Sequence, residues 1–235
     1  NSTAYSSDGI SWTAGTNIFS TGGKGIAWNG TIWVAVGSGT NNTAYSYDGI
    51  NWIAGTSIFS SGGNGVAWNG SIWVAVGTDG TNTIATSTDG ITWTGRGKTI
   101  LGTSGNGVAW NGNFWVAVGS GTNSTAYSAD GITWTAGTNI FASGGNGVAW
   151  NGNLFVAVGT DGTNTIATSI NGTTWTGVGN TLSTSANGVA WNGMRWLASG
   201  NGNMAYSNDG IVWTLLTGSS ASIFTTALCV AYNNA

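Results

Sequence analysis

Aspartate supplies most of the side chains in this sequence that could carry acid–base or metal chemistry. The 235 residues include seven acidic residues, all Asp, together with four Lys or Arg, one Cys and no His. Six similar stretches, such as SYDGINW, place Asp or Asn before Gly, with Trp three residues after that Gly; these positions are Asp8, Asp48, Asp89, Asp130, Asn171 and Asp209. An Asp or Asn here would accept backbone N–H groups within a tight turn while the Gly adopts a positive φ. We therefore expect structural turns rather than catalytic acids.

Enzymatic chemistry is poorly supported by the residues that remain. Without His, neither a Ser-His-Asp nor a Cys-His arrangement can form, and Cys229 has no base to activate it. Only Asp79 and Asp161 lie outside the six turns, which provides a poor acid pair for glycoside hydrolysis and few ligands for calcium. Zinc ligands are missing as well. We predict a protein that is not an enzyme and that has no cofactor and no metal.

Charge and hydropathy argue against two kinds of partner. Charged residues make up 5% of the chain, and the cations are scattered at Lys24, Arg96, Lys98 and Arg195. Binding to nucleic acid requires a basic patch, which these four residues cannot form. No apolar run approaches the roughly 20 residues of a membrane-spanning helix. We predict no nucleic-acid partner and no membrane insertion.

The strands that must position the turns can be recognised from an apolar stretch, VAWNGSIWVAV at residues 66–76. An Asn-Gly step separates its two apolar runs. Asn-Gly between two apolar runs predicts a β-hairpin with a type I′ turn, in which both central residues have a positive φ. The two-residue side-chain period then puts Trp68 and Trp73 on one face, and Val74 and Val76 on the other. Both faces are apolar, so we expect a sheet that is covered on both sides.

This hairpin recurs about every 40 residues and alternates with the Asp-Gly turns. Each repeat reads as four short strands, which is the blade of a β-propeller. We predict an all-β, six-bladed β-propeller of four-stranded antiparallel blades, forming a single domain over residues 1–235, with five blades as the alternative. The expected repeats are 1–24 (partial), 25–64, 65–106, 107–146, 147–187, 188–225 and 226–235 (partial).

The last blade is expected to combine the two termini. Residues 1–24 supply the third and fourth strands of a blade, and residues 226–235 supply a first strand. No segment of the sequence matches the second strand of this blade. Either the blade is degenerate, or another strand fills the gap by β-augmentation. A further period of 82 residues indicates duplication of a two-blade unit, which favours an even number of blades.

The S-x-D-G-x-x-W stretches resemble the Asp-box, also called the BNR repeat, of sialidase-like β-propellers. The resemblance extends over the whole chain, and Asn171 departs from the pattern. It implies a box between the third and fourth strands of each blade. Sialidase activity is not carried over, because a chain with two Arg and no Glu lacks the arginine cluster and the acids that those enzymes need. The resemblance therefore implies a non-catalytic member of this family.

A ligand surface is predicted on the rim opposite the Asn-Gly turns and the boxes. The candidate ligand residues in the loops of that rim are Asp79, Asn82, Asp161, Asn164, Phe19, Phe59, Phe141 and Phe224. The 15 Trp suggest sugar stacking, but their positions in first strands, second strands and boxes predict that most of them form core between blades.

Two functions fit these features. The first is a binding or adhesion module, lectin-like, whose near-identical repeats would present the same weak site several times. The second is a structural or assembly domain of a virion, fibre or surface layer, with no small-molecule ligand. The expected partners are glycans or a surface or virion protein. Low charge and abundant Ser, Thr, Asn and Gly favour an extracellular location or a virion or cell surface.

Overall fold

The computed structural model describes residues 1–216, and every regular element in that range is a β-strand. Two compact units divide the chain, the first with residues 1–99 and 103–105, the second with residues 100–102 and 106 onward. Phe224, Cys229 and the first strand expected at 226–235 lie outside the described residues.

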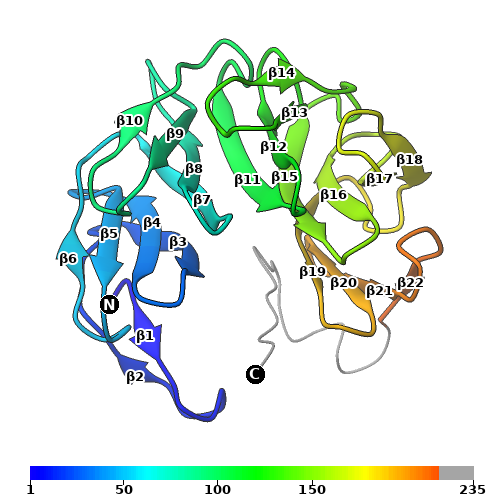
Figure 1. Ribbon diagram of the computed structural model, residues 1–235. Coiled ribbons are helices and arrows are strands. Elements are labelled where there is room, and N and C mark those ends of the chain that lie inside the picture. The colour runs from blue at the N-terminus through cyan, green and yellow to red at the C-terminus, as the bar shows by residue number, and fades with distance from the viewer. Residues whose placement is uncertain (217–235) are drawn as a thin grey trace. The chain divides into compact units, whose positions relative to one another are not determined.

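The first unit contains one two-stranded sheet and two groups of four strands, labelled in Figure 1; Thr78 of the second group also pairs with Ser104 of the same unit. The two-stranded sheet consists of β1 (Ala4–Tyr5) and β2 (Thr13–Ala14). The first four-stranded sheet consists of β3 (Gly22–Trp28), β4 (Trp33–Ser38), β5 (Thr43–Ser46) and β6 (Ile53–Ala54). The second consists of β7 (Gly62–Trp68), β8 (Trp73–Thr78), β9 (Ile84–Ser87) and β10 (Thr94–Gly95).

The second unit contains three further groups of four strands. The third group consists of β11 (Ser104–Trp110), β12 (Trp115–Ser120), β13 (Thr125–Ser128) and β14 (Thr135–Ala136); the first two residues of β11 belong to the first unit. The fourth consists of β15 (Gly144–Trp150), β16 (Phe155–Thr160), β17 (Ile166–Ser169) and β18 (Thr176–Gly179). The fifth consists of β19 (Ala186–Trp191), β20 (Trp196–Gly200), β21 (Met204–Ser207) and β22 (Thr214–Leu215).

Each group follows the chain order, with consecutive strands paired side by side, and the pairs between its four strands are antiparallel. The predicted all-β fold with four antiparallel strands per repeat is therefore present in five groups over residues 22–216. A four-stranded group of this kind is the blade of a β-propeller. A sixth blade is not among the described residues.

The hairpin turns differ from the expected type I′ turn. Trp68 pairs with Trp73, so residues 69–72 form a four-residue loop. The positive φ of this loop falls on Gly70, at 99°, and not on Asn69. The Asn69 Oδ1 accepts the backbone N–H groups two and three residues further on, at 2.9 and 2.8 Å. The Asn side chain thus closes a wider loop, which removes the need for a second positive φ.

Both faces of the second strands are buried, as the apolar pattern predicts, whereas most apolar residues of the first strands are half-buried and Ile26 is exposed. Trp73 and Ala75 on one face, and Val74 and Val76 on the other, are fully buried. The observed strand pairing is shifted by two residues from the pairing that a two-residue turn would give. Each side chain still lies on its predicted face, because side chains alternate with a period of two. Cross-strand aromatic pairs close the hairpins, with ring centroids 5.0 Å apart for Trp68 and Trp73.

Neighbouring sheets are joined at their first strands by long polar side chains. Asn106 Nδ2 donates to the Gly145 carbonyl at 2.8 Å, and Asn146 Nδ2 donates to the Ala186 carbonyl at 2.9 Å. Lys24 has the same place in the first sheet, where its Nζ donates to Asn64 Oδ1 at 2.9 Å; the two residues belong to the first unit. These bonds satisfy polar groups between packed sheets, so the first strands can approach closely.

Candidate functional site

The boxes are tight turns whose carboxylate is held by backbone donors. Asp130 Oδ1 accepts the N–H groups of Ile132 at 2.8 Å and Thr133 at 2.7 Å, and also the Ser128 hydroxyl at 2.9 Å. The Ser128 oxygen accepts the Gly131 N–H at 2.8 Å. Gly131 has a φ of 74°, which an L side chain rarely adopts. One oxygen of the box residue therefore takes three hydrogen bonds that hold the turn.

The other five boxes have the same geometry, at Asp8, Asp48, Asp89, Asn171 and Asp209. At Asn171 the amide Oδ1 replaces the carboxylate oxygen and accepts the N–H groups of Thr173 and Thr174, each at 3.0 Å. Five boxes lie between the third and fourth strands of a four-stranded group, and Asp8 lies between β1 and β2.

Backbone donors stabilise the ionised form of the box carboxylates. The Thr133 N–H has the largest part in lowering the pKa of Asp130 to about 2. The Ser11 N–H does the same for Asp8, whose pKa is also lowered to about 2. An unfolded Asp has a pKa of about 3.9, so the folded boxes keep their charge at lower pH than the unfolded chain does.

We expect the melting temperature to fall as the pH drops from about 4 to about 2. Because the folded pKa is the lower one, the boxes stabilise the fold fully above the unfolded pKa, and this contribution is lost as pH falls through the folded pKa. An Asp130→Asn variant should lose less of its melting temperature over this interval, because an amide takes up no proton and Asn171 shows that it fits the turn. Thermal unfolding followed by circular dichroism from about pH 6 to about pH 2 tests this. Identical pH profiles for variant and wild type would contradict it.

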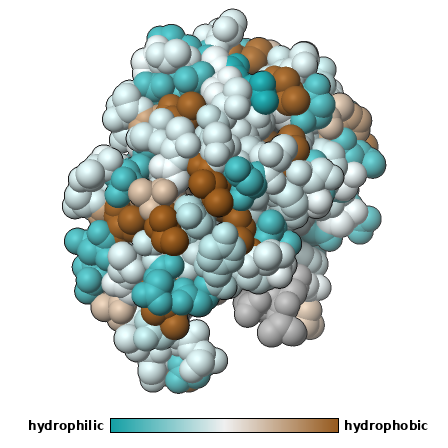
Figure 2. All heavy atoms as spheres, turned by 60° about the vertical axis from the view of Figure 1, so that its left-hand side comes forward, coloured by the Kyte–Doolittle hydropathy of each residue, from teal (hydrophilic) through white to brown (hydrophobic). Residues whose placement is uncertain are grey.

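Large apolar side chains are exposed mainly at the box turns and the Asn-Gly turns. These turns lie at the same end of each four-stranded group, because both connect an odd-numbered strand of the group to the next even-numbered one. The exposed residues there, which we call the box rim, are Ile10, Trp12, Trp28, Tyr47, Ile50, Phe114, Ile132, Ile170, Met194, Ile211 and Val212. On the face seen in Figure 2, apolar residues form small separate groups among hydrophilic ones.

The loops at the other end of the sheets bury their aromatic residues. Phe19, Phe59 and Phe141 are each 1% exposed and belong to the hydrophobic core. Phe59 packs in one cluster with Val34 and Trp73. This corrects the expectation that the three Phe side chains present themselves to a ligand, since a buried ring is covered by its own fold. Phe224 lies outside the described residues.

The two asparagines expected at that end brace the same loops. Asn82 Oδ1 accepts the N–H of Gly97 at 3.0 Å. Asn164 Oδ1 accepts the N–H of Gly179 at 3.2 Å. The two half-buried side chains hold the chain where the fourth strands end, so their acceptor oxygens are engaged within the protein.

The two aspartates of that end differ in their partners. The Ser60 hydroxyl donates to Asp79, and this bond is the main cause that lowers the pKa of Asp79. Asp161 accepts the N–H of Thr163 at 3.2 Å. The two acids come from loops of different units.

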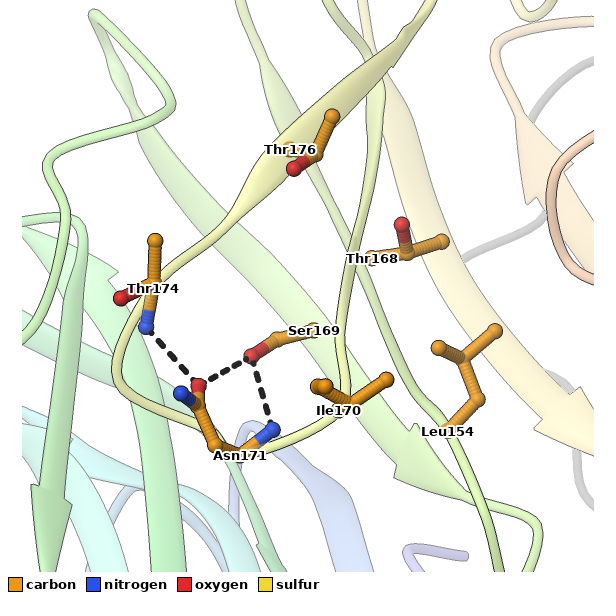
Figure 3. A pocket seen from close by; sticks show the side chains of 7 residues that line it. All are labelled: Leu154, Thr168, Ser169, Ile170, Asn171, Thr174 and Thr176. Atoms are coloured by element: carbon orange, nitrogen blue, oxygen red, sulfur yellow. Dashed lines mark hydrogen bonds between the residues drawn. The ribbon is translucent and has the colours of Figure 1, made fainter.

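A hollow of about 470 Å³ lies on the box rim of the fourth sheet. Its lining residues are Leu154, Thr168, Ser169, Ile170, Asn171, Thr174 and Thr176. Figure 3 shows that the Asn171 side-chain nitrogen takes part in none of the hydrogen bonds drawn, which use Oδ1 and the Ser169 hydroxyl. The lining combines hydroxyl and amide groups with two aliphatic side chains and contains no charged side chain. The sequence signal for this site is the single Asn among the boxes, whose pattern by itself predicts only a structural variant of the turn.

Residues 1–216 hold no group of three or more acidic, His or Cys side chains that could bind a metal ion. Over the same range, no helix has the length and apolar character to cross a membrane.

The repeated four-stranded groups define a β-propeller-like, all-β fold, and comparison with known structures agrees. No model of a protein family matches the chain, and no curated protein matches it in sequence. Solved structures with the same fold include the computationally designed Ika8 protein, at 14% identity and a TM-score of 0.60, with 83% of this chain and 61% of that chain covered.

Two natural proteins have a similar fold. A GH74 enzyme of Niastella koreensis is 20% identical with a TM-score of 0.64, and the match covers 90% of this chain and 34% of the enzyme. A chain of a nidogen/laminin complex is 9% identical with a TM-score of 0.64, over 89% of this chain and 84% of that one. This chain thus spans about a third of the enzyme and less than two thirds of the designed protein. At such identities the likeness shows the fold alone.

Proposed function

We propose that this protein is a non-catalytic binding module, lectin-like, on a cell or virion surface, and that the box rim contacts its ligand. The observation that carries the proposal is the exposure of aromatic side chains in turns at this end of the sheets. Tyr47, in a box turn, is 63% exposed, and Phe114, in an Asn-Gly loop, is 38% exposed. Aromatic side chains with an open face are the usual apolar platform for a sugar ring, and few charges surround them.

Repetition would strengthen weak binding at this rim. The boxes and hairpins recur about every 40 residues, so several shallow contacts can act on one multivalent glycan. The box carboxylates hold their own turns, which supports binding rather than acid–base catalysis. We place the ligand at the box rim and not at the opposite end, because the aromatic residues of the latter are core.

A double variant, Tyr47→Ala with Phe114→Ala, should weaken binding to a glycan-coated surface by about tenfold or more, since tenfold corresponds to about 1.4 kcal/mol. Both side chains are exposed, so the fold should be retained. Binding on a glycan array and by surface plasmon resonance measures the effect. Ile53→Ala is the matched control, because Ile53 is equally exposed but lies in β6 away from the turns.

The outcome also separates the two functions. Absence of glycan binding by the wild type across broad sugar classes would overturn the lectin-like proposal. Association of the protein with itself or with a virion, fibre or surface-layer protein under those conditions would favour the structural or assembly role instead.

We also propose that the protein is an Asp-box propeller of six blades, the sixth combining residues 1–24 with residues 226–235. The pair β1 and β2 with its box supports this, because it matches the third and fourth strands of a blade. The Trp-Asn-Gly repeat aligns Cys229 with Gly25 and Gly65.

The reactivity of the Cys229 thiol would test this closure. At the aligned position in the first sheet, a Cβ on Gly25 would lie 3.1 Å from the Gly65 Cα in the next first strand. In a closed six-bladed ring we therefore expect the Cys229 side chain to pack on Gly25 and to react slowly with iodoacetamide until the protein is unfolded in urea. An Ile10→Cys variant adds a reference thiol at an exposed turn, which should react fast in the folded protein. Equally fast alkylation of Cys229 and of the reference thiol in the folded protein, followed by mass spectrometry, would contradict six blades.

A further inference from the structure

The hollow on the fourth sheet differs from the equivalent place on the other sheets in two ways that both make it available to a ligand. We propose that it is the principal sugar site of the protein and binds one neutral hexopyranose residue. This inference rests on the proposed function and names the ligand class and the site.

The first difference is Asn171. Its Oδ1 accepts the hydrogen bonds that a carboxylate oxygen accepts in the other boxes. The turn leaves Nδ2 unused, so two N–H donors stand where the other boxes carry the second oxygen of a negative carboxylate. The exchange removes a charge from the hollow and adds donors, without loss of the turn.

The second difference is Thr168, seen by comparison with the sheet 82 residues earlier. There Thr86 has the same position, and the Arg96 Nε donates to its Oγ1 at 2.9 Å. In the fourth sheet Val178 replaces the arginine and cannot donate, and the Thr168 hydroxyl forms no hydrogen bond with any residue in the range 1–216. Thr168 is 8% exposed as a residue and lines the hollow, so its hydroxyl is available there for a ligand to pair with.

The remaining lining fits a neutral sugar better than an ion or a purely apolar molecule. Thr174 and Thr176 add hydroxyl groups, whereas Leu154 and Ile170 add an aliphatic surface. A hexopyranose presents hydroxyl groups around its edge and C–H groups on its faces, so it can pair with both kinds of lining. A volume of about 470 Å³ lies within the range of small-molecule sites, roughly 300–1,000 Å³. No charged residue is present among the lining to attract an ionic ligand.

Calorimetric titration with the methyl glycosides of glucose, galactose and mannose tests the site. We expect at least one of them to bind to the full chain with one strong site, and Asn171→Asp to weaken that binding about tenfold or more. This variant should fold normally, because Asp fills the same place in the other five boxes. Asp130→Asn makes the reverse exchange in the third sheet and should leave the affinity unchanged.

A gain of function provides a second, independent arm. Asp89→Asn with Arg96→Val gives the second sheet the two features of the fourth, so the double variant should bind a second equivalent of the same glycoside. Arg96→Val alone keeps the carboxylate and should bind a single equivalent, as the wild type does.

The results separate this inference from the proposed function. If the wild type binds glycosides but Asn171→Asp binds them equally well, the hollow is not the site, whereas the lectin-like function stands. If no glycoside binds and the glycan array is negative, both are overturned. A double variant that gains no second equivalent would show that these two features do not make the site.

Discussion

Replacing Trp115 by alanine should lower the free energy of unfolding by about 3–5 kcal/mol. Trp115 lies in β12, is 0% exposed, and its ring packs against that of Trp110 with centroids 5.1 Å apart. Truncation to alanine removes most of a large buried side chain and leaves a cavity between packed strands, which the surrounding β-structure cannot fill by a small shift. Urea unfolding followed by far-ultraviolet circular dichroism measures the loss.

A Trp115→Phe variant is the informative control, because the chain already makes this exchange. Phe155 has the equivalent place in the fourth sheet, where it is fully buried and packs on Trp150 with ring centroids 4.5 Å apart. In addition, Trp115 Nε1 is buried without a hydrogen-bond partner among the described residues, and an unpaired buried donor costs about 1–3 kcal/mol. Removing this donor should offset part of the lost contact, so we expect a loss below about 1.5 kcal/mol. Equal losses for Phe and Ala would contradict this account.

The second large effect is expected at Gly159, where alanine should cost about 3 kcal/mol. A Cβ at this position would lie 2.5 Å from the Gly144 carbonyl oxygen and 2.5 Å from Cγ of Phe141. Neither can move freely, because Gly144 is paired with Thr160 in the sheet and the Phe141 ring is enclosed in the core. Thermal and urea unfolding of the Gly159→Ala variant measure the effect.

Gly162→Ala, in the loop that follows the same strand, serves as the control. A Cβ there would meet nothing within 4 Å, and neither Gly159 nor Gly162 has a positive φ, so the main difference between the two changes is the space around the new methyl group. We expect the change at Gly162 to stay within about 0.5 kcal/mol. If the two variants had the same stability, close packing of Phe141 on the Gly159 backbone would not explain the buried ring.

The ring of Phe141 on the Gly159 backbone also explains why this side chain is buried although its sequence context predicts a ligand surface. In sequence, Phe141 stands in a polar, Gly-rich loop, which is typical of an exposed aromatic residue at a binding surface. In the structure the ring covers a glycine 18 residues later, and this contact buries it. The box isoleucines show the reverse: they follow Gly in a tight turn, and Ile132 is 48% exposed.

The sequence by itself determined the strands, the two buried faces of the second strand in each hairpin and the box turns. These features depend on local rules, namely side-chain alternation with a period of two and the affinity of an Asp or Asn oxygen for nearby backbone N–H groups. Asn171 could be identified as the departure from the box pattern, although not as part of a hollow. Only the tertiary structure decided which loop residues are exposed and that Asn69 closes a four-residue turn. It also decided that the Thr168 hydroxyl has no hydrogen-bond partner among the described residues, whereas the Thr86 hydroxyl accepts a hydrogen bond from Arg96. Each of these depends on how backbone and side chains approach one another in three dimensions, and alternation and composition do not encode such distances.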